Sequence, residues 1–404
     1  MAATVTRPDF DLLSPSFYGD IDAMHEAFRW MRANEPVYRD RNGFVGITRH
    51  ADLLDVEHRD GDFSSAGSYR SVANPDEDNM IAQDDPGHLA QRRLVSRRFT
   101  PKAVRAMEPV LSRMIGGLLA GVLDGVEPGG EGRTEAVVAL AAALPARLTA
   151  HLLGFPEEMW PEIKSWSERL MRYDSVPHDP AAFNDFLGAI GEFVAVLQPV
   201  AQQRRECPAD DLVTTWVQGE ASGCPMDDSK LVNETGLVIS GGAETTRTVI
   251  ARSLVTFAEH PDQWEAMHDD PSLVPGAVEE MIRWVTPLNN MFRTATKDTA
   301  VGGEPITEGE RIALLYPSAN RDEAVFDDPY RFDIRRTPNQ QVGFGFGTHF
   351  CLGASLARFE LRLLMEQLTA QITDLQVLEP PDIEENIFVG AVRSLHLGFR
   401  RRAA

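Results

Sequence analysis

The sequence is poor in cysteine, in long apolar runs and in basic residues, and each shortage excludes a class of protein. Three cysteines, with no CxxC pair, exclude a disulfide framework and a cysteine-based zinc site. Cys207 and Cys224, each beside a proline, are predicted to be free, inert thiols. The longest apolar stretch, about ten residues at 136–146, is far shorter than the roughly 20 residues that a membrane-spanning helix needs. A net charge of −22, from 61 acidic and 39 basic residues, argues against nucleic acid or an anionic membrane as a partner.

The residues that are present match a large globular protein. Hydrophobic residues make up 43% and charged residues 25% of the 404-residue chain, which is typical of folded domains. The stretch 1–17 mixes charged and apolar residues and lacks the apolar core of a secretory signal. We therefore expect a cytoplasmic protein without a membrane span.

The order of helical and strand patterns predicts one mainly helical domain, residues 1–404, with small sheets. Apolar residues recur at helical spacing over 24–31, and predicted strands at 37–40 and 44–48 flank an Asn-Gly turn. Residues 86–282 predict a succession of helices, with strands returning only at 299–301, 311–315 and near the C-terminus. No linker, repeat or change of composition divides the chain.

One predicted helix, residues 227–259, is unusually long. At 1.5 Å per residue it would extend roughly 45–50 Å, the width of a whole domain. Its middle, Leu237 to Thr246, begins apolar and becomes polar at its centre. Polar residues are not expected in the middle of a central, buried helix, so this stretch is a candidate functional site.

Cys351 stands in the strongest candidate site of the chain. It lies in the segment FGFGTHFCLG, residues 344–353, directly before a helical run that starts at Ala354. The glycines allow close approaches that side chains would block, and the N-terminus of the following helix favours a thiolate. A thiolate walled by Phe344 and Phe350 suits ligation of a flat apolar cofactor. A lone cysteine is usually a core residue, but the composition of this loop argues against that alternative.

This loop resembles the haem-binding loop of the cytochrome P-450 monooxygenases, and three further motifs of that family precede it in the expected order along the chain. Residues 241–246, GGAETT, resemble the oxygen-activating stretch of the long central helix. Glu280 and Arg283 resemble the helical ExxR pair, and residues 326–333 resemble the segment before the haem loop. The resemblance covers essentially the whole chain. It implies the cytochrome P-450 fold, mainly α with small β-sheets, and haem b with Cys351 as the axial ligand.

The resemblance also implies roles for the motif residues. Thr245 is expected to donate a hydrogen bond to bound dioxygen, and Glu244 is expected to supply protons. The alternative, that Thr245 only bonds to an earlier carbonyl group of its helix, is usual for a threonine inside a helix. Glu280 and Arg283 are expected to form a buried structural pair, whereas such a pair considered alone is usually a weak surface bridge.

A haem carries two propionates, whose burial requires cations that can form hydrogen bonds. His88 and Arg92 are four residues apart and therefore share one face of a predicted helix. The resemblance assigns cofactor binding to His88, Arg92, Arg293, His349, Phe344 and Gly345.

The resemblance implies a mainly apolar substrate cleft above the haem. By analogy its lining residues are Met80, Ile81, Val238, Gly242, Thr245, Val249, Leu288, Asn290, Met291, Ile387 and Phe388. The segments 30–43 and 276–293 are most similar to actinobacterial members that oxidise the terminal side-chain carbon of cholesterol and related steroids. Fatty acids and polyketide or terpenoid precursors are the alternative substrates.

The implied enzyme hydroxylates its substrate with O2 and two electrons from a ferredoxin and its reductase, which are expected to be separate proteins. A haem sensor without turnover and a peroxide-driven oxidase are the alternatives. Residues 92–105 carry six basic residues and no acid. An acidic ferredoxin is expected to dock on a patch formed by Arg93, Arg97, Arg98 and Lys102, joined by Arg358 and Arg362.

Overall fold

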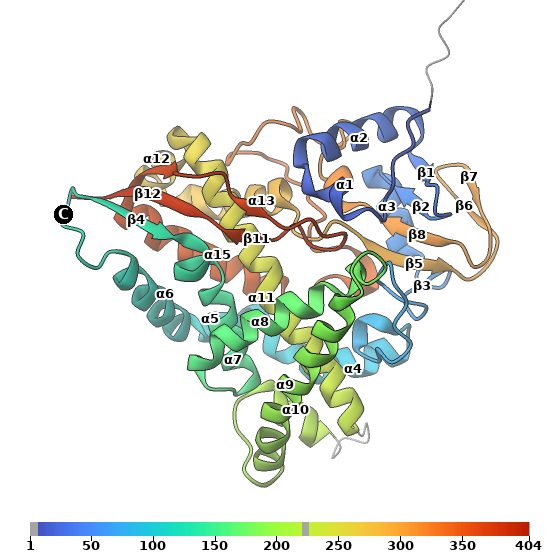
Figure 1. Cartoon of the computed structure of the whole chain (residues 1–404), viewed down its shortest axis with the longest axis horizontal. Coiled ribbons are helices and arrows are strands. Elements are labelled where there is room, and N and C mark those ends of the chain that lie inside the picture. Colours follow the sequence, from blue (N-terminus) through green and yellow to red (C-terminus); the bar gives the residue numbers. More distant parts are fainter. Residues whose placement is uncertain (1–6, 220–225, 404) are drawn as a thin grey trace, which may run out of the picture.

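Helices dominate the computed structural model, which describes residues 7–219 and 226–403 (Figure 1). The long predicted helix is α11 (Asp228–Glu259), which is capped by the Asp227 side chain and ends just before Pro261. It runs through the middle of the molecule and packs against α7 (Ala143–Leu153), α8 (Trp160–Met171) and α13 (Val274–Val285). These neighbours bury most of the second half of α11.

The other helices surround this centre, and the predicted helix over 24–31 lies within α2. They are α1 (Pro15–Gly19), α2 (Ile21–Asn34), α3 (His50–His58), α4 (Gly87–Val95), α5 (Pro101–Ala106), α6 (Glu108–Val122), α9 (Ala181–Glu206), α10 (Leu212–Gln218), α12 (Pro261–Asp269), α14 (Tyr316–Ala319) and α15 (Ala354–Gln371). Short helical turns include η1 (Met80–Ala82) and η2 (Ser96–Phe99). In the described ranges, no helix has the length and apolar character needed to cross a membrane.

Two sheets lie toward opposite ends of the molecule (Figure 1). The five-stranded sheet has the order β1 (Val37–Arg39), β2 (Val45–Ile47), β8 (Arg311–Leu314), β5 (Met291–Ala295) and β3 (Phe63–Ser64). Strands β1 and β2 form the predicted Asn-Gly hairpin, with Tyr38 opposite Gly46. The three-stranded sheet has the order β4 (Glu131–Glu135), β12 (His396–Arg401) and β9 (Ile372–Val377). Two-stranded sheets pair β6 (Thr299–Val301) with β7 (Glu304–Ile306), and β10 (Asp382–Ile383) with β11 (Val392–Ser394).

The predicted strands at 299–301 and 311–315 form, but the expectation of helices alone over 86–282 was wrong. Strand β4 lies within that range and pairs with β12, more than 250 residues later in the chain. Its sequence EGRTE carries no apolar alternation, so only the distant partner makes it a strand. Strands β3, β5 and β7 were also missed, because each is too short for a clear periodic signal.

Candidate active site

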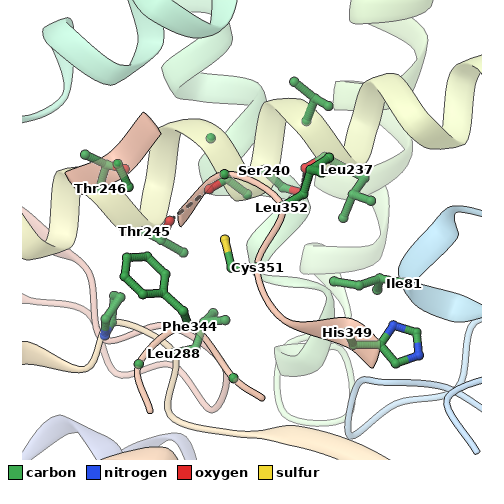
Figure 2. A pocket seen from close by; sticks show the side chains of 18 of the residues that line it. Ile81, Leu237, Ser240, Thr245, Thr246, Leu288, Phe344, His349, Cys351 and Leu352 are labelled. Atoms are coloured by element: carbon green, nitrogen blue, oxygen red, sulfur yellow. Dashed lines mark hydrogen bonds between the residues drawn. The ribbon is translucent and has the colours of Figure 1, made fainter. Parts of the chain in front are cut away.

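A cavity lies at the boundary between the two largest clusters of buried apolar side chains, beside the middle of α11. Its walls come from α3, α4, α7, α8, α11, α13, α14 and α15, from β5 and the turn η1, and from the loops around Leu288, Phe344 and Phe388. Figure 2 shows how side chains from distant parts of the chain, such as Ile81, Leu237 and Leu288, surround this space. Most of the lining is apolar, and its few polar groups are therefore informative.

Cys351 directs its sulfur atom into the cavity, toward the part of α11 that carries Ser240 and Thr245 (Figure 2). The loop is closed by a 2.9 Å hydrogen bond from the N–H of Cys351 to the carbonyl oxygen of Phe344. The thiol is accessible through the cavity, and the surrounding protein raises its pKa by desolvation. Backbone bonds from Gly353 and the first residue of α15 oppose this rise without cancelling it. The expected preference for a thiolate therefore requires a bound cation at the sulfur.

Two glycines of the Cys351 loop have backbone conformations that other residues avoid. Gly345 has a φ of +69° and Gly347 a φ of +65°, both in the left-handed region that costs a residue with a Cβ atom about 1–2 kcal/mol. A Cβ atom at Gly347 would also overlap the carbonyl oxygen of Glu57 in α3. These two positions therefore set the path of the loop and its contact with α3.

Two histidines bring unpartnered ring nitrogens to the cavity. His88 on α4 and His349 on the Cys351 loop lie with ring centroids 4.4 Å apart. The Nδ1 atom of His88 is 3.1 Å from a carboxylate oxygen of Asp85. Nε2 of His88 and Nδ1 of His349 are buried without a hydrogen-bond partner among the described residues. Burial and nearby cations, Arg293 foremost, lower the pKa of His349 to about 3. These nitrogens can meet a polar group that enters the cavity.

Two arginines lie in the same part of the cavity as the histidines. Arg92 donates a 2.5 Å hydrogen bond to the carbonyl oxygen of Phe350, next to Cys351. Arg293 on β5 is 6% exposed. Among the described residues its guanidinium group donates a hydrogen bond to the carbonyl oxygen of Phe292 and lies 3.6 Å from Oε1 of Glu57, which leaves further N–H groups for a ligand. Together with the two histidines, these cations suit a cofactor that is flat and apolar at its centre and anionic at its edge.

Thr245 and Glu244 occupy different environments although they are neighbours in the chain. Thr245 lines the cavity, and its hydroxyl group donates to the carbonyl oxygen of Gly241 at 2.8 Å, the dashed line in Figure 2. This is the hydrogen bond to an earlier carbonyl group of the same helix that the sequence analysis gave as the alternative role of Thr245. Glu244 does not line the cavity: it is 2% exposed and lies 2.9 Å from Nη2 of Arg247. Burial raises the pKa of Glu244 to about 7 in spite of Arg247.

Arg247 connects Glu244 to the protein surface. It also forms an ion pair with Glu168 on α8, which is only partly buried and lies 2.6 Å from Lys164. A chain of charged groups therefore leads from solvent to the residue beside Thr245.

Glycines at positions 241 and 242 shape the wall of the cavity. A Cβ atom at Gly242 would lie 2.8 Å from Oγ1 of Thr149 on α7, so this glycine allows α7 to approach α11 closely. A Cβ atom at Gly241 would meet nothing within 4 Å, because this position faces open space.

Glu280 and Arg283 are both fully buried on α13, which excludes a surface ion pair. Nε and Nη2 of Arg283 each donate to Glu280 at 2.7 Å. Nη1 of Arg283 donates to the carbonyl oxygens of Asn320 and Pro329, both at 2.9 Å. The N–H of Asp333 donates to Glu280 at 2.9 Å. The pair thus ties the segment that leads to the Cys351 loop to α13.

Most predicted substrate-lining residues lie in the cavity wall, together with Thr245. They are Met80, Ile81, Val238, Gly242, Val249, Leu288, Met291 and Phe388. Asn290 and Ile387 do not line the cavity, and Nδ2 of Asn290 instead donates to the carbonyl oxygen of Ile387 at 2.9 Å. Successive side chains of an extended segment point to opposite sides, so Met291 faces the cavity while Asn290 faces away.

The sequence did not predict several other residues of the cavity wall. They are Glu57, Tyr69, Arg70, Leu148, Thr149, Met171, Tyr316 and Glu360. None lies in a motif with a chemical signature. Only the packing of helices α3, α7, α8, α14 and α15 brings Glu57, Leu148, Thr149, Met171, Tyr316 and Glu360 to one site. For Leu148 and Met171 the only available signal was the apolar face of a helix.

The predicted basic patch divides into free and paired side chains. Arg93, Arg97 and Lys102 are exposed and form no ion pair within the described part of the chain. The same holds for Arg105, a neighbouring cation that was not predicted to belong to the patch. Arg98 pairs with Asp210 at 2.7 Å, Arg358 with Glu279 at 2.5 Å, and Arg362 with Glu366 at 3.4 Å. Helix α5 packs against α15, and Arg92 bonds to Phe350, so the free cations lie near the Cys351 loop.

The part of the chain that the structure describes shows no further group of cysteines or metal-binding side chains beside the cavity. Cys207 is exposed and unpaired, and Cys224 lies outside the described residues. Across 7–219 and 226–403, no three His, Cys, Asp or Glu side chains are grouped to hold a metal ion.

Comparisons with known proteins find relatives in one family, by sequence and by fold. The sequence model of the family described as cytochrome P-450 matches residues 181–385. A steroid C26-monooxygenase of Mycolicibacterium smegmatis is 41% identical, over 99% of this chain and 98% of that protein. One of Mycobacterium tuberculosis is 39% identical, over 92% of this chain and 91% of that protein. A Mycobacterium marinum cytochrome P-450 solved in complex with pseudoionone superposes with a TM-score of 0.87 at 29% identity, over 97% of this chain and 99% of that one.

Proposed function

The chain belongs to the cytochrome P-450 family of haem-thiolate monooxygenases, and from that premise we propose that it hydroxylates the terminal side-chain carbon of a cholesterol-derived steroid. The observation that carries this proposal is 41% identity to a steroid C26-monooxygenase over nearly the whole of both chains. The apolar lining of the cavity beside Cys351 supports a hydrophobic substrate.

The residues of the cavity fit the haem b of this family. We assign the axial position to Cys351 and the propionates to His88, Arg92, Arg293 and His349. The unpartnered nitrogens of the two histidines support this assignment, because buried polar atoms without partners are rare unless a ligand satisfies them. When bound, the haem supplies the activation of dioxygen, and donation from a thiolate ligand assists cleavage of the O–O bond.

The protein's own part is to deliver protons and to hold the substrate. We assign proton transfer from solvent to the cavity to Glu244, with the hydroxyl group of Thr245 as the last donor. Arg247 stays protonated and positions Glu244 through its ion pairs with Glu244 and Glu168. Glu244 suits this role because a group with a pKa of about 7 both accepts and releases a proton at neutral pH. For Thr245 to donate into the cavity, its hydroxyl hydrogen must leave the carbonyl oxygen of Gly241, which requires only a rotation about the C–O bond.

Electrons are proposed to arrive from a small acidic ferredoxin with its separate reductase. The exposed cations Arg93, Arg97, Lys102 and Arg105, which have no ion-pair partner among the described residues, form the proposed docking patch. Arg98, Arg358 and Arg362 already pair with acids of the protein. A local basic patch on a chain with a net charge of −22 favours a specific orientation of an acidic partner.

The substrate is tested by adding ligands to the purified ferric protein and recording the shift of the Soret band. The panel contains cholest-4-en-3-one, testosterone, palmitate, pseudoionone and a macrolide. We expect a high-spin shift at the lowest concentration with cholest-4-en-3-one, and a hydroxylated side chain in the product after turnover. No shift with cholestenone, or tighter binding of palmitate or pseudoionone, would exclude the steroid proposal.

A second experiment separates a monooxygenase from a haem sensor or a peroxide-driven oxidase. Product formed per NADH is compared for the wild type, Thr245→Ala and Thr248→Ala, using a ferredoxin and its reductase. Thr248 is a matched control because its hydroxyl also donates to a helix carbonyl group but is fully buried. We expect Thr245→Ala alone to lower this ratio. An unchanged ratio in Thr245→Ala would contradict the proposed proton route. Product formed with hydrogen peroxide, but not with ferredoxin and reductase, would favour the peroxide-driven oxidase, and no product with either would favour the haem sensor.

A further inference from the structure

Glu57 is a buried acid in the part of the cavity where cations were expected. It lies near the C-terminal end of α3, is 6% exposed and lines the cavity. Its Oε1 atom accepts a 2.9 Å hydrogen bond from the hydroxyl group of Tyr316 and lies 3.6 Å from Nη2 of Arg293. Its Oε2 atom is buried without a hydrogen-bond partner in the described ranges. One oxygen of the carboxyl group is therefore held in place, and the other is available to a group bound in the cavity.

The Cys351 loop fixes the position of this carboxyl group. Gly347 packs directly against the backbone of Glu57, and the backbone of Phe346 is close enough to the carboxyl group to lower its pKa. A Cβ atom at Gly345 would lie 3.3 Å from Oε1 of Glu57, so the loop passes close to the acid itself. The loop that carries the thiol thus also holds Glu57 beside the edge of any group bound at Cys351.

With a haem present, the two arginines in this part of the cavity would be matched by the two propionates, and no further arginine among the described residues there would balance an ionised Glu57. Arg92 and Arg293 bring two permanent positive charges, which match the two propionates of the haem. An ionised Glu57 would add a third negative charge close to them. Two carboxyl groups that share one buried site cannot both ionise easily, so one of them keeps a proton. The free Oε2 atom is the place where Glu57 can carry that proton.

We propose that Glu57 is a proton-binding residue at the edge of the haem, whose neutral carboxyl group donates a hydrogen bond through Oε2 to a propionate. One electron from the ferredoxin converts ferric to ferrous iron, and the added negative charge strengthens proton binding at Glu57. Reduction is therefore accompanied by partial uptake of one proton from solvent, and the reduction potential falls as the pH rises through the titration of Glu57. The proposal rests on the haem-thiolate part of the proposed function and is independent of the steroid substrate.

The surroundings of Glu57 define the pH range in which this effect is expected. The groups that act on it are Tyr316 from α14, Arg293 from β5 and the Phe346 N–H from the loop, while His88, Arg92 and His349 line the same cavity. Burial raises the pKa of Glu57 to about 7, and Arg293, Tyr316 and Phe346 oppose that rise. A propionate at Oε2 would raise the pKa further, so the titration is expected above neutral pH.

The experiment measures the reduction potential of the haem by spectroelectrochemistry from pH 6 to pH 9.5. The holoenzymes compared are the wild type, Glu57→Gln, Tyr316→Phe and Glu234→Gln. Glu234 is a matched control because it is also a buried acid with a raised pKa of about 8, but it does not line the cavity. The absorption band of the ferrous carbon-monoxide complex is recorded first, because its absence at the thiolate position would refute the proposed function rather than the role of Glu57.

We expect the potential of the wild type and of Glu234→Gln to fall with rising pH, and that of Glu57→Gln to change much less. In Tyr316→Phe the fall should move to higher pH, because the Tyr316 hydroxyl stabilises the ionised form of Glu57. This second variant keeps the test valid if Glu57→Gln loses its haem. The proposal would be overturned if the reduction potential of the wild type did not fall with rising pH, or if it fell equally in Glu57→Gln. It would also be overturned if the pH range of the fall were the same in Tyr316→Phe as in the wild type.

Discussion

Replacing Arg283 with alanine should remove most of the stability of the fold, and the structure allows the loss to be estimated. The substitution breaks a fully buried ion pair with Glu280, which costs about 3–5 kcal/mol in comparable proteins. It also removes the donor from the carbonyl oxygens of Asn320 and Pro329, and each buried acceptor left unpaired costs about 1–3 kcal/mol. Water that enters the space offsets part of this, so a loss of about 5 kcal/mol is expected, comparable to the whole stability of many domains.

Arg283→Lys separates the charge from the geometry of the guanidinium group. Lysine keeps the positive charge but cannot bond to Glu280 and both carbonyl oxygens at once, so an intermediate loss of about 2–3 kcal/mol is expected. Urea unfolding followed by circular dichroism, together with the haem content of the purified protein, measures both effects. Arg362→Ala is the control, because its ion pair with Glu366 is partly exposed and is worth less than about 1 kcal/mol. A loss below about 1 kcal/mol for Arg283→Ala would refute the reasoning.

Three further changes test the loop, the buried acid on α11 and the docking patch. Gly347→Ala should lower the haem content and the melting temperature, because a Cβ atom there is strained and overlaps the backbone of α3. The folded state binds the proton of Glu244 more tightly than the unfolded state does, since its pKa is raised from 4.5 to about 7. Stability should therefore fall as the pH rises from about 4.5 to about 7, and Glu244→Gln should gain up to about 3 kcal/mol relative to the wild type between pH 5 and pH 8 in urea unfolding. Reversing Arg93 and Arg97 to Glu should slow reduction by an acidic ferredoxin about tenfold or more at low salt and weaken the salt dependence in stopped-flow measurements.

Matched variants provide the controls for these predictions. Gly309 has a φ of +85° with nothing near its would-be Cβ atom, so Gly309→Ala should cost stability without lowering the haem content. Arg133 is exposed on β4, toward the other end of the molecule from α4, so Arg133→Glu should leave reduction unchanged (Figure 1). Equal haem content in the two glycine variants, or equal reduction rates in the two charge reversals, would contradict the predictions. For Glu244→Gln, the prediction would be contradicted if the difference in free energy of unfolding from the wild type did not change with pH.

The sequence by itself determined the parts of this protein that depend on neighbouring residues. The loop around Cys351, the length and polar centre of α11, the Asn-Gly hairpin and the spacing of His88 and Arg92 on one helix face are all local patterns, because backbone conformation and helix periodicity act over a few residues. The eight predicted substrate-lining residues that lie in the cavity wall were named from the family resemblance, which transfers positions along the chain and not their surroundings.

The tertiary structure decided everything that depends on contacts between distant segments. Strand β4 exists because β12 pairs with it, and Asn290 leaves the cavity wall because the chain alternates beside Met291. Glu244 faces Arg247 rather than the cavity. Arg98 and Arg358 pair with acids from distant segments, and Arg362 pairs with Glu366 one turn later on its own helix. Glu57 is the clearest example. In the sequence it is an ordinary acid of a short helix, and it becomes a buried partner of Arg293 and Tyr316 only because the fold packs together positions more than 200 residues apart. Its burial and its charged neighbours are properties of the folded surroundings, which the local sequence does not contain.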